Sequence, residues 1–386
     1  MEVDAMDRIA FIFGETFIYW SSIVLTLAAV LAGFLFLAFY LYKEQNVLAA
    51  AVVIPVSVFF SLVIARFVHW YCRSDSYAGF LSAMTDYSCG GYALLGVFAG
   101  CALAAVIVRV AGMTDNLPCL LDCMSLAGCA GIAVGRLNGF FNAQDRGQII
   151  SSVQSLPWVY PVTNTVSGAL EYRLATFVIQ AMVTAVIFGA LVAFAFATDK
   201  KRRDGDLTLF FLLLYGASQV VLDSTRYDSL FFRSNGFISI VQVVSALATG
   251  LACAVFSVRL VRTHGLDKRY IALWAIFAAF VGLGGYMEYH VQRHGDQAVF
   301  AYSLMSMALL GMVFVVTVIW LLAQKEPEEK PVPENTQTEA VPAQKQERKP
   351  KAKFAQPKQT HWEEEEDLYI PLEELGLPED FFFEDE

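Results

Sequence analysis

The polar residues best placed to do chemistry gather in one stretch, from Gly135 to Gly147, which follows an apolar segment. The stretch contains Arg136, Asn138, Asn142, Gln144, Asp145 and Arg146. Polar side chains at the mouth of a membrane helix indicate a functional site by default, and an arginine can bind a phosphate through two parallel hydrogen bonds. The alternative is a solvated interfacial loop whose arginines hold lipid headgroups.

A second polar group ends a later apolar segment. Tyr215, Gln219 and Asp223 recur every four residues and therefore share one face of a helix. Arg226 follows Asp223 by three residues, which predicts an ion pair between the two. Because burying such a stripe without partners costs several kcal/mol, we expect it to face the interior of a helix bundle.

Three weaker features accompany these groups. Arg66 and His69 are three residues apart and share a helix face, although an arginine that snorkels to the headgroups beside an aromatic anchor explains the same pattern. Gly90 and Gly91 belong to a glycine-rich segment that allows close approach of a neighbouring helix, the commoner cause, or of a ligand. Gln242 is a polar residue near the start of a further apolar segment.

The composition excludes an ordinary soluble enzyme. Of the 386 residues, 56% are hydrophobic and 17% are charged, against roughly 25% charged residues in a soluble domain. Mean hydropathy is +0.51. The net charge of −10 arises from the tail, where the chain from Lys325 onward has 8 Lys/Arg and 18 Asp/Glu. The seven cysteines show no paired metal-ligand spacing, and we expect neither a metal nor a cofactor.

The pattern predicts an all-α polytopic membrane protein with about nine transmembrane helices. A crossing helix needs roughly 20 apolar residues, and only helices satisfy the backbone of runs this long in lipid. The predicted spans are Phe17–Tyr42, Val47–Trp70, Tyr92–Val110, Cys119–Gly135, Leu174–Thr198, Leu207–Leu222, Phe237–Leu260, Tyr270–Met287 and Phe300–Leu322.

Basic residues predict an N-out, C-in orientation. Lys200, Lys201, Arg202 and Arg203 follow the fifth span, and Arg259, Arg262, Lys268 and Arg269 follow the seventh. By the positive-inside rule this side faces the cytoplasm. The external side has no lysine but carries Arg66, Arg73, Arg136, Arg146, Arg173, Arg226 and Arg233. Because arginine suits bidentate phosphate binding, anionic lipid headgroups would explain these arginines.

In order and spacing these features resemble the bacterial prolipoprotein diacylglyceryl transferases. The residues that carry the resemblance are Tyr19, Arg66, Gly90, Gly91, Arg136, Phe140, Asn142, Gly147, Tyr215, Gly216, Arg226, Gln242 and Ser245. The chain departs from the family pattern where Leu95 stands for a histidine, Gln144 for a glutamate, Gln219 for an arginine and Asp223 for a glutamate, and where Asn138-Gly139 reverses a Gly-Asn pair.

The resemblance implies transfer of a diacylglyceryl group from phosphatidylglycerol to the lipobox cysteine of prolipoproteins. Arg136 and Arg226 would hold the headgroup phosphate with Arg66 in support, and Asp223 or His69 would accept the thiol proton. Asn142, Gln144 and Gln219 would donate hydrogen bonds to the substrate. Tyr19, Gly90, Gly91 and Gln242 complete the implied binding residues.

The chain divides into a transferase-like core (1–262), two additional helices (263–324) and a disordered acidic cytoplasmic tail (325–386). The tail ends in a stretch that is interpreted either as a solubilising end or as a docking motif for a cytoplasmic partner. The expected location is the bacterial plasma membrane, with the site toward the outer leaflet; no nucleic acid partner is expected. Because glutamine cannot transfer a proton as glutamate does, the alternative is a catalytically degenerate paralogue that binds anionic lipid or lipoproteins.

Overall fold

The structure, a computed structural model, describes residues 9–85, 91–141, 146–149, 159–163, 168–199, 201–232, 235–293 and 298–325. The long helices are α1 (Trp20–Tyr42), α2 (Val47–Cys72), α4 (Leu94–Val110), α5 (Leu117–Gly135), α6 (Thr176–Ala197), α7 (Asp206–Ser224), α8 (Ile240–His264), α9 (Lys268–Arg293) and α10 (Ala298–Gln324). In this part of the chain eight helices are long and apolar enough to cross a membrane, and α4 is a shorter apolar helix. The predicted all-α polytopic membrane fold is confirmed. The N-out, C-in orientation stays a prediction.

Each long helix lies within a few residues of a predicted span, and the ends account for the differences. The eighth predicted span is too short, because α9 continues outward to Lys268 and Arg293, whose charged heads can reach the interface. The first predicted span begins too early. Residues Thr16–Tyr19 form strand β2, which pairs with β1 (Ile9–Phe13), so α1 begins only at Trp20.

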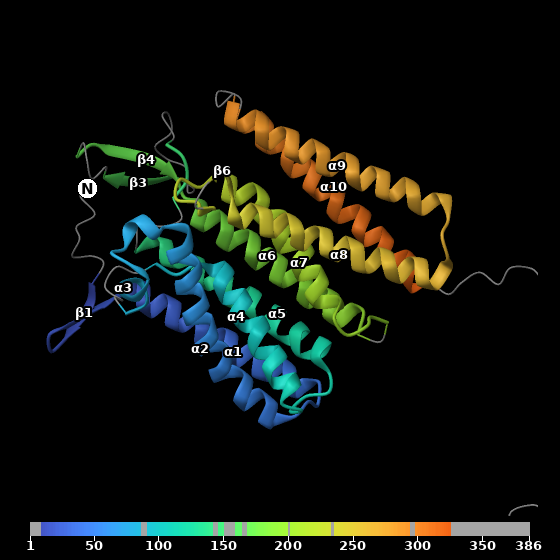
Figure 1. The fold of residues 1–386 in the computed structure, drawn as a ribbon, viewed down its shortest axis with the longest axis horizontal. Coiled ribbons are helices and arrows are strands. Elements are labelled where there is room, and N and C mark those ends of the chain that lie inside the picture. The colour runs from blue at the N-terminus through green and yellow to red at the C-terminus, as the bar shows by residue number, and fades with distance from the viewer. Residues whose placement is uncertain are drawn as a thin grey trace, which may run out of the picture. The chain divides into compact units, whose positions relative to one another are not determined.

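Short strands occupy the polar connections at one end of the bundle. They form three antiparallel two-stranded sheets: β1 with β2, β3 (Val159–Thr163) with β4 (Leu170–Leu174), and β5 (Phe231–Phe232) with β6 (Asn235–Ser239). Figure 1 shows β1, β3, β4 and β6 at the same end as the short helix α3 (Phe80–Thr85), with the α6–α7 and α8–α9 turns at the other end. The sequence pattern does not predict these strands, because each is five residues or fewer.

The glycine-rich segment packs α4 against α2. A side chain at Gly96 would overlap the backbone of Ala65, and one at Gly100 would overlap the backbone of Ser61. Small residues four apart on a membrane helix allow the backbones to approach closely. For this part of the segment, helix packing is therefore the correct interpretation.

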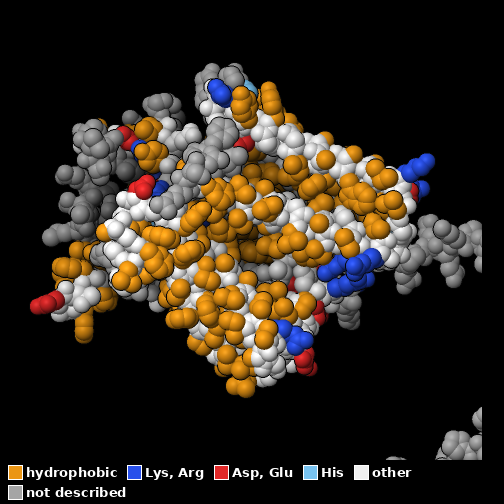
Figure 2. All heavy atoms as spheres, viewed as in Figure 1, with side chains coloured by type: hydrophobic (Ala, Val, Ile, Leu, Met, Phe, Trp, Pro, Cys, Tyr) orange, Lys and Arg blue, Asp and Glu red, His pale blue; other side chains and the backbone are white. Residues whose placement is uncertain are grey.

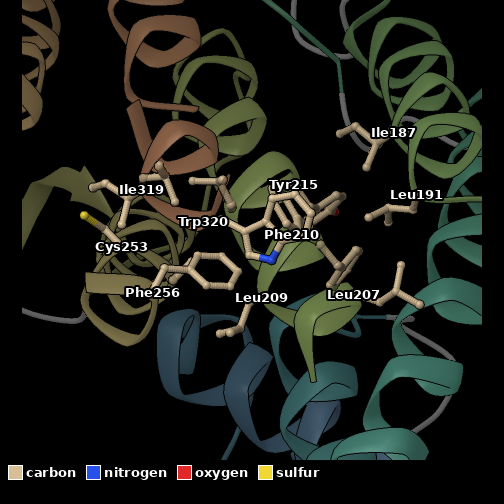
Figure 3. Close-up of a cluster of buried hydrophobic side chains, with 14 of the residues drawn as sticks. Ile187, Leu191, Leu207, Leu209, Phe210, Tyr215, Cys253, Phe256, Ile319 and Trp320 are labelled. Carbon is tan, nitrogen blue, oxygen red and sulfur yellow. The ribbon is translucent and has the colours of Figure 1, made fainter. Parts of the chain in front are cut away.

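The apolar core surrounds α7. Figure 3 shows Trp320 of α10 beside Phe210 of α7 and Phe256 of α8; the Phe210 ring centroid lies 5.4 Å from each of the other two rings. The Trp320 indole N–H also donates to Asp206 at 3.0 Å. The α9–α10 pair, which corresponds to the predicted additional helices, is thus joined to the core through α10.

The outer surface of the bundle is largely apolar, as lipid contact requires. Figure 2 shows hydrophobic side chains over the middle of the helices and Lys and Arg side chains near the helix ends. At the end that carries the α6–α7 and α8–α9 turns, Lys201, Arg203, Arg262, Lys268 and Arg269 are exposed. The predicted tail lies outside the described residues, which end at Lys325.

Candidate functional site

Asp223, in the last turn of α7, is almost fully buried, with 1% of its surface exposed. Its carboxylate accepts a hydrogen bond from the Ser239 hydroxyl and one of 3.3 Å from Arg226 Nη1. The predicted ion pair is therefore present. The positive charge of Arg136, at the C-terminal end of α5, also acts on this carboxylate. Two predicted phosphate ligands and a predicted proton acceptor thus form one electrostatic cluster.

Arg226 connects this cluster to the end of α2. Its Nε and Nη2 atoms both donate to Asp228 Oδ1 at 3.1 Å. The Asp228 backbone carbonyl in turn accepts a hydrogen bond of 3.0 Å from Arg73, the C-cap residue of α2. At least three of the five N–H groups of the Arg226 guanidinium are therefore used within the protein.

Backbone pairing holds the end of the 135–147 stretch beside Arg226. Gly147 forms an antiparallel bridge with Arg226, and its N–H donates to Leu174 O in β4 at 2.8 Å. The Tyr227 N–H donates to Arg146 O at 2.9 Å. A Cβ atom at Gly147 would lie 2.6 Å from the Leu174 Cβ. Only glycine therefore fits between the end of α7 and β4 without a shift of the backbone.

Gln242 serves the same cluster indirectly. Ser239 and Gln242 form a capping box at the start of α8, in which the Ser239 N–H donates to Gln242 Oε1 at 3.2 Å. The Gln242 Nε2 donates to Val220 O at 3.2 Å. Gln242 thus positions the serine that donates to Asp223, and both of its amide atoms contact the backbone.

Gln219 lies inside the bundle, as its predicted stripe requires. It is 1% exposed, and its Oε1 accepts a hydrogen bond of 3.4 Å from Gln180 of α6. Gln180 is fully buried, and the sequence analysis did not name it. The signal that could have identified it is a lone glutamine in the first half of α6, where the other residues are apolar or threonine.

Arg66 organises the segment that follows α2. Its side chain is 2% exposed and donates to the backbone carbonyls of Ala83 and, at 3.1 Å, Gly91. Its guanidinium carbon lies 5.1 Å from the Tyr77 ring centroid and 5.5 Å from that of Tyr92. These contacts hold the segment after α2 in place, and the role of Arg66 in supporting the phosphate ligands stays a prediction.

His69 contacts the same segment as Arg66, through Tyr77. Its Nδ1 lies 2.9 Å from the Tyr77 hydroxyl. Gly91 adopts a left-handed backbone with φ of +89°, and a Cβ there would lie 2.6 Å from the His69 ring. Among the described residues no hydrogen bond joins His69 to Asp223. The end of α2 and the Asp223 cluster are connected through Arg73 and Asp228.

Arg146 is a buried cation that the sequence analysis did not assign to the site. It is 6% exposed, its Nη2 donates to Gly139 O at 3.1 Å, and its guanidinium carbon lies 4.0 Å from the Tyr160 ring centroid. Its place inside the 135–147 stretch was the available signal. Arg146 therefore joins the β3–β4 hairpin to the end of α5.

Tyr19 is half exposed at the junction of β2 and α1, where it precedes the first helical residue. The next residue, Trp20, stacks on Phe141 with ring centroids 6.0 Å apart. Tyr19 thus lies near the end of the short helix formed by Arg136–Phe140. The predicted ligands Gly90, Asn142 and Gln144 lie outside the described residues.

The last two helices also reach this end of α7. Ser224, next to Asp223, donates from its hydroxyl to Glu288 of α9 at 3.1 Å. Its backbone carbonyl accepts a hydrogen bond of 3.2 Å from the Tyr302 hydroxyl of α10. The α9–α10 pair therefore supports the helix end that carries Asp223.

Comparison with known proteins gives a consistent result. A family model described as prolipoprotein diacylglyceryl transferase matches residues 8–258. The phosphatidylglycerol–prolipoprotein diacylglyceryl transferase of Finegoldia magna is 29% identical over 246 residues, which cover 62% of this chain and 90% of that protein. The protein of the same name from Clostridium kluyveri is 26% identical over 254 residues, which cover 65% and 96%. The match includes α1 to α8 almost completely and excludes α9 and α10.

Proposed function

The chain belongs to the prolipoprotein diacylglyceryl transferase family, and we propose that it transfers a diacylglyceryl group from phosphatidylglycerol to the lipobox cysteine of prolipoproteins. The observation that carries this proposal is the Asp223 carboxylate, buried beside Arg226 and within the field of Arg136. The location we propose is the bacterial plasma membrane, with this end of the bundle at the outer leaflet.

The reaction needs a proton acceptor and cations for a leaving phosphate. The cysteine thiol gives up its proton, its sulfur forms a bond to the glyceryl carbon, and the C–O bond breaks so that glycerol phosphate leaves with the electron pair. Asp223 is the proposed acceptor of the thiol proton. Arg136 is the proposed ligand of the departing phosphate, because fixed cations stabilise the charge that develops on a leaving group.

Arg226 has a different proposed share in the reaction. Because its guanidinium already donates to Asp223 and Asp228, we assign to it the orientation of the Asp223 carboxylate and a longer-range attraction for the phosphate. Ser239 and Gln242 hold the same carboxylate from the start of α8. His69, which contacts Tyr77, is a proposed binding residue rather than the base.

The test is a lipidation assay with the purified protein, phosphatidylglycerol and a lipobox peptide, followed by the mass of the peptide. We expect lipidation by the wild type and a loss of about a hundredfold in Arg136→Ala, the cost typical of removing one donor to a developing charge. Arg293→Ala, an exposed arginine at the end of α9, is the matched control and should keep full activity. Unchanged lipidation by Arg136→Ala would refute the proposal.

A catalytically degenerate paralogue that binds anionic lipid is the second candidate. The neutral pair of Gln180 and Gln219 favours it, because the family resemblance places an arginine at position 219. On this hypothesis the protein binds phosphatidylglycerol but leaves the peptide unmodified, and Arg136→Ala weakens lipid binding alone. Turnover in the same assay would exclude it.

A further inference from the structure

Helix α10 runs antiparallel to α7 and donates a hydrogen bond to each end of it. At one end the Trp320 indole N–H donates to Asp206, the first residue of α7, at 3.0 Å. At the other end the Tyr302 hydroxyl donates to the backbone carbonyl of Ser224, the last residue of α7, at 3.2 Å. The two acceptors are separated in α7 by the same number of residues as the two donors in α10. Because α-helices rise by the same amount per residue, both bonds fit one register and fix α10 along the whole of α7.

A seam of apolar residues determines which face of α10 meets its neighbours. In alternate steps of three and four residues from Tyr302, the seam continues through buried side chains: Met305, Leu309, Met312, Val316, Ile319 and Ala323. This spacing is that of the contact seam between packed helices. Tyr302 itself packs against the buried cluster that includes Ala217 of α7. The packing of α10 therefore turns the Tyr302 side chain toward the end of α7 that carries Asp223.

The hydrogen bond from Tyr302 holds this end of α7 in place. The Ser224 carbonyl is one of the last four of the helix, which have no N–H partner within an α-helix. The other hydroxyl groups of α10 donate to carbonyls of α10 itself. Tyr302 is therefore the residue whose hydroxyl joins α10 to the residue next to Asp223.

The same hydroxyl also reaches the segment that follows the 135–147 stretch. The Gln148 side chain is a second hydrogen-bond partner of the Tyr302 hydroxyl, and the preceding residue, Gly147, forms the antiparallel bridge with Arg226. Tyr302 thus contacts both segments at the place where the 135–147 stretch meets the residues after α7. Because α10 lies outside the matched residues 8–258, this contact is an addition to the family core.

We propose that Tyr302 is a positioning residue of the transfer reaction, an inference that rests on the proposed function. Its hydroxyl holds the end of α7 so that the Asp223 carboxylate stays where it can accept the thiol proton. Tyr302 acts through Asp223 and does not touch the substrate. Because a small misplacement of a reacting group slows a reaction strongly, this hydroxyl controls the rate of transfer and leaves substrate binding unchanged. The α9–α10 pair is therefore a part of the framework that carries the chemistry.

Tyr302→Phe tests the proposal, because it removes the hydroxyl and keeps the ring that packs in the seam. In the lipidation assay with the full chain, phosphatidylglycerol and the lipobox peptide, we expect kcat to fall roughly tenfold and both KM values to change by less than about twofold. Tyr286→Phe is the matched control, because it removes the hydroxyl of an exposed tyrosine of α9, and it should leave kcat and KM unchanged. Equal kcat values for the two variants overturn the proposal.

A second peptide separates positioning of the proton acceptor from a loss of folded protein. In this peptide selenocysteine replaces the lipobox cysteine, and a selenol is largely ionised at neutral pH, so it has little need of a proton acceptor. The loss of rate in Tyr302→Phe should then shrink to less than about twofold. Partial unfolding would instead lower the rates of both peptides equally, and the same loss with both peptides therefore overturns the proposal.

The failure of this inference is distinguishable from the failure of the proposed function. If the wild type lipidates neither peptide, the proposed function is wrong and this inference falls with it. If the wild type lipidates the cysteine peptide and Tyr302→Phe does so at the same rate, this inference alone is wrong and the proposed function stands.

Discussion

The Ser239 hydroxyl donates a hydrogen bond to the Asp223 carboxylate and accepts the hydrogen bonds that cap α8. One side chain therefore fixes both the start of a helix and the orientation of the proposed proton acceptor. Because Gln242 completes the capping box, α7 and α8 meet through a connected set of hydrogen bonds rather than through apolar contact alone. Such a set makes the position of Asp223 depend on residues that never touch the substrate.

Ser239→Ala should therefore impair both stability and turnover. Loss of an N-cap costs about 1 kcal/mol, and loss of a buried hydrogen bond to a charged group costs about 1.5–3 kcal/mol. We expect a lower melting temperature in detergent and slower lipidation of the lipobox peptide. Ser303→Ala removes an exposed hydroxyl that donates to Val299 O within α10, and it should change neither quantity. Equal melting temperatures for the two variants would contradict this account.

Asp223→Asn and Asp228→Asn separate the chemistry from the scaffold. Both variants weaken an ion pair of Arg226, but only the first removes the proposed proton acceptor. We expect Asp223→Asn to lose at least about a hundredfold in turnover, in the range of general-base catalysis, and Asp228→Asn to lose much less. Rates measured at saturating phosphatidylglycerol report the difference. A larger loss in Asp228→Asn would instead assign the central role in turnover to Asp228, in the loop that follows α7.

Two glycines provide a matched test of the α2–α4 contact. A Cβ atom at Gly100 would overlap the Ser61 backbone, whereas one at Gly189 in α6 meets nothing within 4 Å. Gly100→Ala should therefore destabilise the protein, by about 1–3 kcal/mol as overpacked sites do. Gly189→Ala should be neutral or stabilising by up to about 1 kcal/mol, because alanine favours helix. Thermal unfolding of both variants in the same detergent checks the opposite signs.

The helices could be predicted from the sequence because lipid leaves the backbone no alternative. Apolar runs such as that of α2 need internal hydrogen bonds, so their existence follows from hydropathy alone. The pair of Asp223 and Arg226 could also be predicted, because spacing along one helix fixes which side chains meet. The number of spans between them predicts that Arg136 and Asp223 lie on the same side of the membrane.

The remaining parts of the site depend on contacts between segments far apart in sequence. Gln180 meets Gln219 only because α6 packs beside α7, and no local pattern records that. Gln242 stays a binding residue that the family resemblance implies, and the sequence does not predict that its amide atoms serve a helix cap and a carbonyl of α7. The short strands escaped prediction because strands of two to five residues carry too little periodicity.

Acid should remove the contribution of the ion pair between Lys43 and Asp199, which joins the ends of α1 and α6. The hydrogen bond from Lys43 lowers the pKa of Asp199 below its usual 3.8. A carboxyl whose pKa is lowered by folding adds stability above its unfolded pKa and loses that stability as the pH falls through the folded value. The melting temperatures of wild type and Asp199→Asn, measured in lipid-free detergent, should therefore differ near neutral pH and converge well below pH 3.8. High salt should also shrink the difference, because the pair is partly exposed. A difference that grows in acid would show that Asp199 acts through another contact.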